Sequence, residues 1–263
     1  MNSTARLSRF TSMSPETVAL SVAMAVAAGL VGCFAVMRRM ALSADALSHV
    51  ALPGIGVAMA LHVHPLAGAV AMLFFGALLV WALENRARLA TETIIGVVFS
   101  AALAVGSMIA SGDDLIEALF GGGGALSRLE VAFGLIAATA VVAFILKEKH
   151  ALVLALVSPD IARTAGVNLR RLNLLYLQMF ALTIALGLRY LGVLLMGSLI
   201  IIPAATAQRL SKNLNQMLTV AVGIAVATTV VGSWLALWLH RETGPVIVTL
   251  ATGCFLLTFL RRP

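Results

Sequence analysis

Charged residues are scarce in this sequence. Asp, Glu, Lys and Arg make up 11% of the 263 residues, against roughly 25% in a typical soluble domain. In contrast, 61% of the residues are hydrophobic and the mean hydropathy is +1.03. Long polar stretches are also missing, because apolar runs near the length that crosses a ~30 Å hydrocarbon core follow one another with short breaks. This composition excludes a soluble domain and predicts a single all-α integral membrane domain over residues 1–263.

Two further absences narrow the function. The chain has two cysteines, Cys33 and Cys254, which lie in apolar runs without a CxxC pattern, so we expect structural thiols and no redox or metal role. It also contains no GxxxxGK[ST] phosphate loop, so it cannot hydrolyse ATP by that route. No predicted span carries a second catalytic carboxylate or a Ser/His arrangement, which disfavours an intramembrane hydrolase.

Nine apolar segments are candidate transmembrane helices. Their number is open between eight and nine, because residues 188 and 190 bound two segments that nearly touch and the apolar run 151–157 is too short to cross alone. A broken or re-entrant piece would lower the number of full spans. The candidates are 16–37, 40–61, 66–83, 93–110, 129–146, 172–188, 190–207, 216–239 and 245–260.

The distribution of the 18 Lys and Arg residues predicts the sides of the loops. With a periplasmic N-terminus most of them fall in cytoplasmic loops, for example Arg38, Arg86 and Lys147. The positive-inside rule therefore predicts residues 1–14 as a periplasmic segment and the C-terminus as cytoplasmic. The first apolar run has the length of a span and no small-residue cleavage site, so we expect a retained helix. The same bias accounts for the net charge of +7, and no nucleic-acid partner is needed to explain it.

The stretch "ALSADALSHVALPG" at residues 41–54 places Asp45 and His49 four residues apart inside a predicted span. On a helix this spacing puts both side chains on one face. Counting ~1.5 Å per residue from Arg38 places them near the middle of the ~30 Å core, where an isolated charge costs at least about 2.5 kcal/mol. We therefore expect the pair to bind a metal ion or a proton, or else to join two helices as a structural pair.

The ligand types and the neighbouring residues extend this interpretation. A carboxylate and an imidazole suit zinc, manganese or iron(II), whereas calcium needs more oxygen ligands. Two ligands alone hold an ion weakly, but two copies of the chain about a twofold axis would supply four. Pro53 and Gly54 follow one turn later and are expected to kink the helix. His62 and His64, at the periplasmic end, are candidates for a metal entrance or are solvated interfacial side chains.

Three motifs resemble the ABC-3 family of permeases, the membrane subunits of bacterial ABC importers for zinc, manganese and iron. They are "MRRMALSADALSHVALPG" at 37–54, "SPDIARTAGVNLRRLNLL" at 158–175 and "GVLLMGSLIIIPAATAQRLSKNLNQM" at 192–217. The family pattern usually has Gly where this chain has Ala44. The resemblance implies a type II-like ABC importer permease with eight or nine transmembrane helices in the inner membrane. It also implies that Asp45 and His49 are the intramembrane metal ligands.

The resemblance implies partners as well. These are a second permease subunit, identical or paralogous, two cytoplasmic ABC ATPase subunits, a periplasmic metal-binding protein and the lipid bilayer. No permanently bound cofactor is expected, since the metal ion is transported. The predicted function is therefore that of a transporter subunit, not an enzyme, which moves the ion from periplasm to cytoplasm by alternating access. The alternative is a proton-coupled secondary transporter of metal ions.

Residues 208–216 follow Pro203 and are polar and basic, so we expect a cytoplasmic coupling loop there. The resemblance implies that this loop docks on the ATPase subunit, with residues 158–171 as a second surface beside it. The alternative is that its basic residues only anchor the chain at anionic lipid. Two leucines of the loop are predicted to share one face of a short helix. The expected coupling residues are Gln208, Arg209, Leu210, Lys212 and Leu214, with Asp160 and Arg163 on the second surface.

Overall fold

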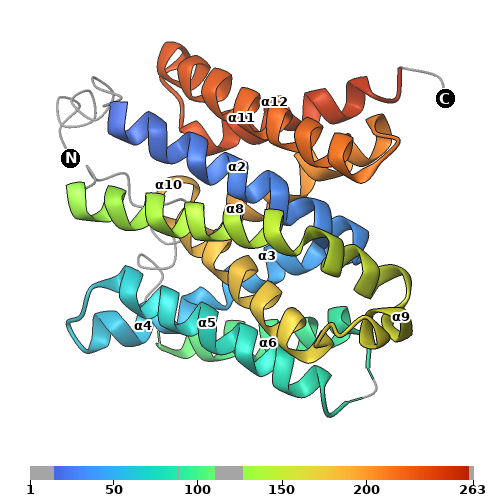
Figure 1. Ribbon diagram of the computed structural model, residues 1–263. Helices are drawn as coiled ribbons and strands as arrows, with labels where there is room; N and C mark the ends of the chain where they lie inside the picture. The colour runs from blue at the N-terminus through green and yellow to red at the C-terminus, as the bar shows by residue number, and fades with distance from the viewer. Residues whose placement is uncertain (1–14, 88, 110–126, 261–263) are drawn as a thin grey trace.

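The chain folds into a bundle of α-helices (Figure 1). The computed structural model describes residues 15–87, 89–109 and 127–260, and the predicted periplasmic segment 1–14 lies outside them. The described residues form ten helices and no strand. The helices are α2 (Pro15–Met37), α3 (Ala41–His49), α4 (Ala51–Ala60), α5 (Pro65–Glu84), α6 (Thr91–Ile109), α8 (Arg128–Val157), α9 (Pro159–Thr164), α10 (Leu169–Leu210), α11 (Leu214–Leu239) and α12 (Thr243–Leu257).

Seven helical segments within the described residues are long and apolar enough to cross a membrane. They correspond to α2, to α3 with α4, to α5, α6 and α8, to the first part of α10, and to α11. Helix α12 is apolar but shorter, at 15 residues. The predicted all-helical membrane bundle is confirmed, and the predicted number of eight or nine spans holds approximately.

Helix α10 covers the two predicted spans 172–188 and 190–207. Its 42 residues are all helical and include Pro203, which lies inside the second predicted span. A Cβ atom on Gly187 would overlap Sδ of Met196, although nine residues of a straight helix span about 13 Å. The helix must therefore turn back on itself between these two residues, and its two limbs pack against each other.

Helix α8 also runs past its predicted end. It begins with a capping box, in which Ser127 Oγ accepts from the Glu130 N–H and the Glu130 carboxylate accepts from the Ser127 N–H. It then continues through the charged turn at 147–150 and ends at Val157. The short apolar run 151–157 is therefore the last part of this helix and not a separate membrane segment.

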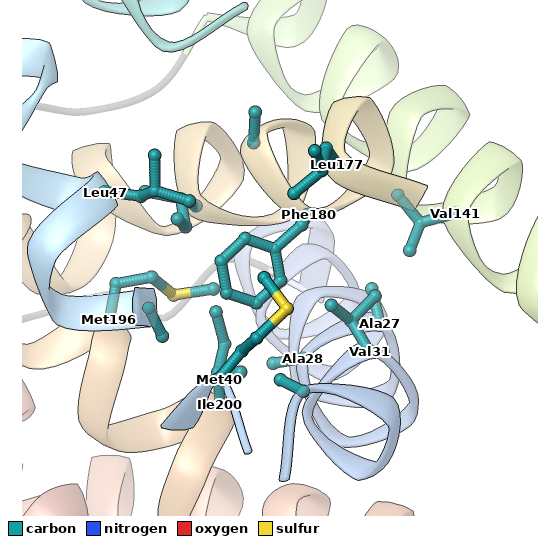
Figure 2. Packing of buried hydrophobic residues seen from close by; sticks show 14 of the residues in the cluster. Ala27, Ala28, Val31, Met40, Leu47, Val141, Leu177, Phe180, Met196 and Ile200 are labelled. Atoms are coloured by element: carbon teal, nitrogen blue, oxygen red, sulfur yellow. The ribbon is translucent and has the colours of Figure 1, made fainter. Parts of the chain in front are cut away.

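The core lies where α2, α3 and the two limbs of α10 meet. Helix α2 packs mainly against α10, α11 and α8, and α10 packs against α3 and α5 as well. Figure 2 shows Phe180 of the first limb of α10 between Met40, which precedes α3, and Met196 and Ile200 of the second limb. All four side chains are at most 3% exposed. Close apolar packing therefore fixes the start of α3 on α10.

The predicted span 40–61 is broken into α3 and α4 at Val50. Pro53 has no N–H to donate to the His49 carbonyl, and its ring crowds that carbonyl. The Val50 N–H instead bonds the Leu47 carbonyl at 3.0 Å, a tighter turn than the α-helix. The break expected at Pro53 and Gly54 thus lies one turn earlier, at the residue beside His49.

Glycines hold α4 closely against its neighbours. A Cβ atom on Gly54 would overlap the carbonyl oxygen of Gly68 in α5, and one on Gly68 would overlap that of Gly54. On α6, a Cβ atom on Gly106 would lie 3.3 Å from Cδ of Pro53. Backbone-to-backbone contact of this kind is typical of small residues between membrane helices. Helix α4 is therefore fixed on two sides.

Candidate metal-binding site

Helix α3 presents one buried and one open face. Ser43, Ala44, Leu47 and Ser48 are buried, whereas Leu42 is 78% exposed and Asp45 is exposed. The main chain of Asp45 nevertheless packs tightly, since a Cβ atom on Gly197 of α10 would lie 2.9 Å from its Cα. The carboxylate of Asp45 is thus held on a firmly seated backbone and faces outward from the chain.

His49 is half-buried at the end of the same helix. Its ring centroid lies 5.6 Å from that of Phe99 in α6, with the planes at 58°. Its Nδ1 atom is buried without a hydrogen-bond partner, and an imidazole nitrogen in that state is costly unless something binds it. Sequence reasoning missed both Phe99 and Gly197, because an aromatic residue or a glycine in an apolar run carries no signal of its own.

One chain supplies an incomplete site. Among the described residues no group of three or more His, Cys, Asp or Glu side chains is close enough to hold a metal ion. Asp45 and His49 therefore receive no third ligand of these types from the described part of the chain. Because Asp45 faces outward, its carboxylate is accessible to a ligand or ion from outside the described part of the chain.

His62 and His64 shape the turn between α4 and α5. His62 has φ 56°, its N–H bonds the Met59 carbonyl, and the next N–H bonds the Ala58 carbonyl, which together form a Schellman motif. His64 caps α5, since its Nδ1 accepts from the Leu66 N–H at 3.3 Å. Both side chains are exposed. The structure gives each a local role and brings neither into a ligand group with Asp45 and His49.

The predicted coupling-loop helix at 208–216 is not present. Helix α10 ends at Leu210 and α11 begins at Leu214, so the two leucines lie on different helices and not on one face. Arg209 is engaged within the chain, because its Nε donates to Thr258 Oγ1 at 3.1 Å and its guanidinium lies 3.8 Å from the ring centroid of Phe259. Gln208 and Lys212 are exposed. The segment is a tight connection, with Arg209 joining α10 to the end of α12.

The second predicted surface contains a short helix, α9, which packs against α8 and α10 through Ala162 and exposes its other face. Ser158 caps it by accepting from the Ile161 N–H, and Asp160 pairs with Arg163 at 3.1 Å with both side chains exposed. Val157 and Ile161 are 78% and 58% exposed. Exposed apolar side chains therefore lie at the end of α8 and on α9.

The amino-acid sequence of the chain is similar to those of known membrane proteins. The model of a family described as the ABC 3 transport family matches residues 11–262. The manganese transport system membrane protein MntC of Listeria innocua is 28% identical over 247 residues, which cover 92% of this chain and 88% of that protein. The high-affinity zinc uptake system membrane protein ZnuB of Haemophilus influenzae is 30% identical over 237 residues, which cover 88% and 90%.

A solved structure has the same fold. A chain of PsaBC from Streptococcus pneumoniae, in complex with Fab, superposes with a TM-score of 0.80, covering 99% of this chain and 96% of that one at 23% identity. At that identity the likeness supports the fold and not the individual side chains.

Proposed function

Because this chain belongs to the ABC 3 transport family, we propose that it moves a divalent transition-metal ion from the periplasm to the cytoplasm by alternating access. The predicted family membership is confirmed, and the chain is a multi-pass membrane permease subunit of a metal ABC transporter. It is not an enzyme, and ATP is hydrolysed by a separate subunit. Relatives named for manganese and zinc transport support these two ions as its cargo, and iron(II) suits the same ligand types.

The observation that carries the proposal is the open face of α3. Asp45 is exposed there and the half-buried His49 follows one turn later on the same helix, and the described residues add no third His, Cys, Asp or Glu ligand. A second permease subunit facing this one would add a matching carboxylate and imidazole and enclose the ion between the two chains. The second subunit can be another copy or a paralogue. We further propose that a periplasmic metal-binding protein delivers the ion.

The test is metal uptake by cells that make the chain together with its ATPase and binding protein. An Asp45→Ala, His49→Ala double variant should abolish uptake of radioactive manganese or zinc, because it removes every proposed ligand of this chain. The membrane-inserted amount should stay unchanged. Leu42→Ala, on the same open face, is the control and should transport normally. Uptake by the double variant at the level of this control would refute the site.

The proton-coupled alternative is separated by the energy source. Under the present proposal, uptake stops when ATP is depleted at constant membrane potential and survives an uncoupler at constant ATP. The reverse pattern would favour proton coupling through Asp45 and His49.

We propose the orientation that the charges predict, with the N-terminus periplasmic and the C-terminus cytoplasmic. The geometry supports a shared side for the cytoplasmic segments, because Lys149 Nζ near the end of α8 donates to Asn215 Oδ1 at the start of α11, at 3.0 Å. A reporter after Leu260 should be cytoplasmic and one inserted in the 121–124 segment periplasmic. Opposite results for both would reverse the orientation.

We propose that α9 is the main contact with the ATPase subunit and that residues 208–216 add a second one. The basis is exposure: Ile161 of α9 and Val157, the last residue of α8, are exposed apolar side chains, whereas Arg209 is already bound within the chain. A Val157→Asp, Ile161→Asp variant should no longer co-purify with the ATPase. A Leu210→Asp, Leu214→Asp variant should retain more of it. The opposite ranking would make 208–216 the principal contact.

A further inference from the structure

Four polar side chains from four parts of the bundle form a chain of hydrogen bonds at one end of the molecule. Arg38 follows α2, Glu84 ends α5, Thr91 begins α6 and Asn173 lies in the second turn of α10. Arg38 Nη1 donates to Asn173 Oδ1, Asn173 Nδ2 donates to Glu84 Oε2, and Thr91 Oγ1 donates to Glu84 Oε1, each at 2.6 Å. The amide of Asn173 therefore lies between a cation and an anion.

The arrangement leaves hydrogen-bonding capacity unused. Arg38 Nε is buried without a partner, and its guanidinium lies 4.3 Å from the ring centroid of Tyr176. Arg38 and Glu84 do not pair directly, since the one ion pair within the described residues is that of α9. Burial lowers the pKa of Arg38, and Tyr176 and Glu84 act against that shift. A buried donor without an acceptor is unfavourable, so an arrangement that supplies Nε with an acceptor would gain a hydrogen bond.

Asn173 is tied to α9. Only residues 165–168 separate α9 from α10, and they are folded tightly, with Gly166 at φ 83° and its N–H on the Arg163 carbonyl. The first turn of α10 is held on α5, because Trp81 Nε1 donates to the Arg170 carbonyl at 2.9 Å. Asn173 lies one turn further on. Asn173 is therefore joined to α9 through a connection of four residues and the first turn of α10.

Arg38 is connected to α3, the helix that carries Asp45 and His49. Arg39 has φ 59°, its N–H bonds the Val36 carbonyl, and the Met40 N–H bonds the Ala35 carbonyl, so α2 ends in a Schellman motif that leads directly into α3. Met40 is buried in the core (Figure 2). The position of Arg38 thus sets the direction in which α3 starts, about two turns before Asp45.

We propose that Asn173 is a positioning residue that couples the α9 surface to the Asp45–His49 helix through its two hydrogen bonds, to Arg38 and to Glu84. The inference rests on the proposed function, since it assigns α9 to the ATPase contact and α3 to the ion. When α9 moves, the amide leaves its place between the two charges, and Arg38 turns to Glu84. One bridging amide is thereby exchanged for one direct ion pair, and the start of α3 moves with Arg38. Two discrete arrangements of this kind are what coupling between distant sites requires.

Two nearly isosteric variants test the bridge. Asn173→Asp keeps an acceptor for Arg38 but loses the donor to Glu84, and Asn173→Leu loses both bonds. The matched control is Asn85→Asp, because Asn85 lies at the same end of α5 and its amide bonds only the Trp81 carbonyl of its own helix. The measurements are metal uptake, ATPase activity with and without metal, co-purification of the ATPase, metal binding by the detergent-solubilised complex, and its melting temperature.

Both Asn173 variants should lose about tenfold or more of uptake, in the range of ordinary coupling energies, while the control does not. They should keep the ATPase subunit and bind metal within about twofold of the wild type, and their ATP hydrolysis should lose its dependence on metal. Wild-type uptake by Asn173→Asp would refute the bridge, since a bond to Arg38 alone would then suffice.

A parallel loss of uptake, assembly, metal binding and melting temperature would make Asn173 a structural residue only and would equally overturn the inference. Failure of the wild-type complex to import metal would instead refute the proposed function, and that outcome is read before the variants are compared.

Discussion

Helices α3 and α4 are two halves of one membrane span, and they are built differently. Helix α4 is locked by glycine contacts to α5 and α6, at Gly54 with Gly68 and at Gly106. Helix α3 is seated on α10 along one face, at Gly197, and carries the proposed ligand Asp45 on its exposed face. The break at Val50 allows the two halves to differ in direction. One half anchors the span, and the other presents chemistry to a partner.

The largest effect on this comparison should come from the anchoring half. Gly54→Leu places a side chain where even a Cβ atom overlaps the Gly68 carbonyl, so α4 and α5 must separate. We expect a loss of about 3 kcal/mol in the free energy of unfolding, the upper part of the range for overpacking. The measurement is thermal unfolding of the solubilised protein. Gly96→Leu is the control, since a Cβ there meets nothing within 4 Å. Equal melting temperatures for the two variants would contradict the anchoring role.

A smaller effect, on metal uptake more than on stability, is expected where α3 packs against Gly197 of α10. In Gly197→Ala the added methyl group would lie 2.9 Å from Cα of Asp45, so the backbone of Asp45 must shift. We expect uptake to fall about tenfold, because small displacements of a binding group have large effects on its geometry. The melting temperature should change little. The control is Gly223→Ala, where the added atom meets nothing. Uptake equal to that of the control would show that α3 tolerates displacement.

The smallest effect on uptake should come from the break between α3 and α4 at Val50. Pro53→Ala supplies an N–H that can bond the His49 carbonyl, so the two halves should become one straighter helix. Uptake should fall by about threefold with less than about 1 kcal/mol change in stability. The geometry is measured as the distance between spin labels at positions 42 and 61, both exposed, in a Cys254→Ala background. A longer distance in the variant would show that Pro53 causes the break at Val50. An unchanged distance would show that tertiary packing causes it.

Much of the fold could be predicted because the bilayer imposes length and composition on each span. The segments around α2, α5, α6 and α11 agree with the predicted spans within a few residues. The fold departs where packing overrides local signals. Helix α10 turns back on itself so that Gly187 and Met196 come into contact. No local pattern in the sequence marks that contact.

The sequence indicated the two polar residues of the candidate site but not the residues that pack against them. Asp45 and His49 are conspicuous because charge is expensive inside an apolar run, and their spacing places them on one face. Phe99 and Gly197 are not conspicuous, because their roles arise from neighbours far along the chain. The coupling segment 208–216 was predicted from its polarity and from the family resemblance, neither of which indicates that Arg209 contacts Thr258 and Phe259.

The length of α8 has a consequence for how the molecule meets a partner. Its 30 residues measure about 45 Å, roughly 15 Å more than the hydrocarbon core is thick. Its charged turn, Lys147 to His150, comes about 28 Å from its start, where a helix leaves the hydrocarbon. In the proposed orientation, the remaining two turns carry α9 about 10 Å past that point on the cytoplasmic side. A cytoplasmic protein could then reach α9 without displacing lipid, and α9 would be attached to the membrane part of the chain by a continuous helix.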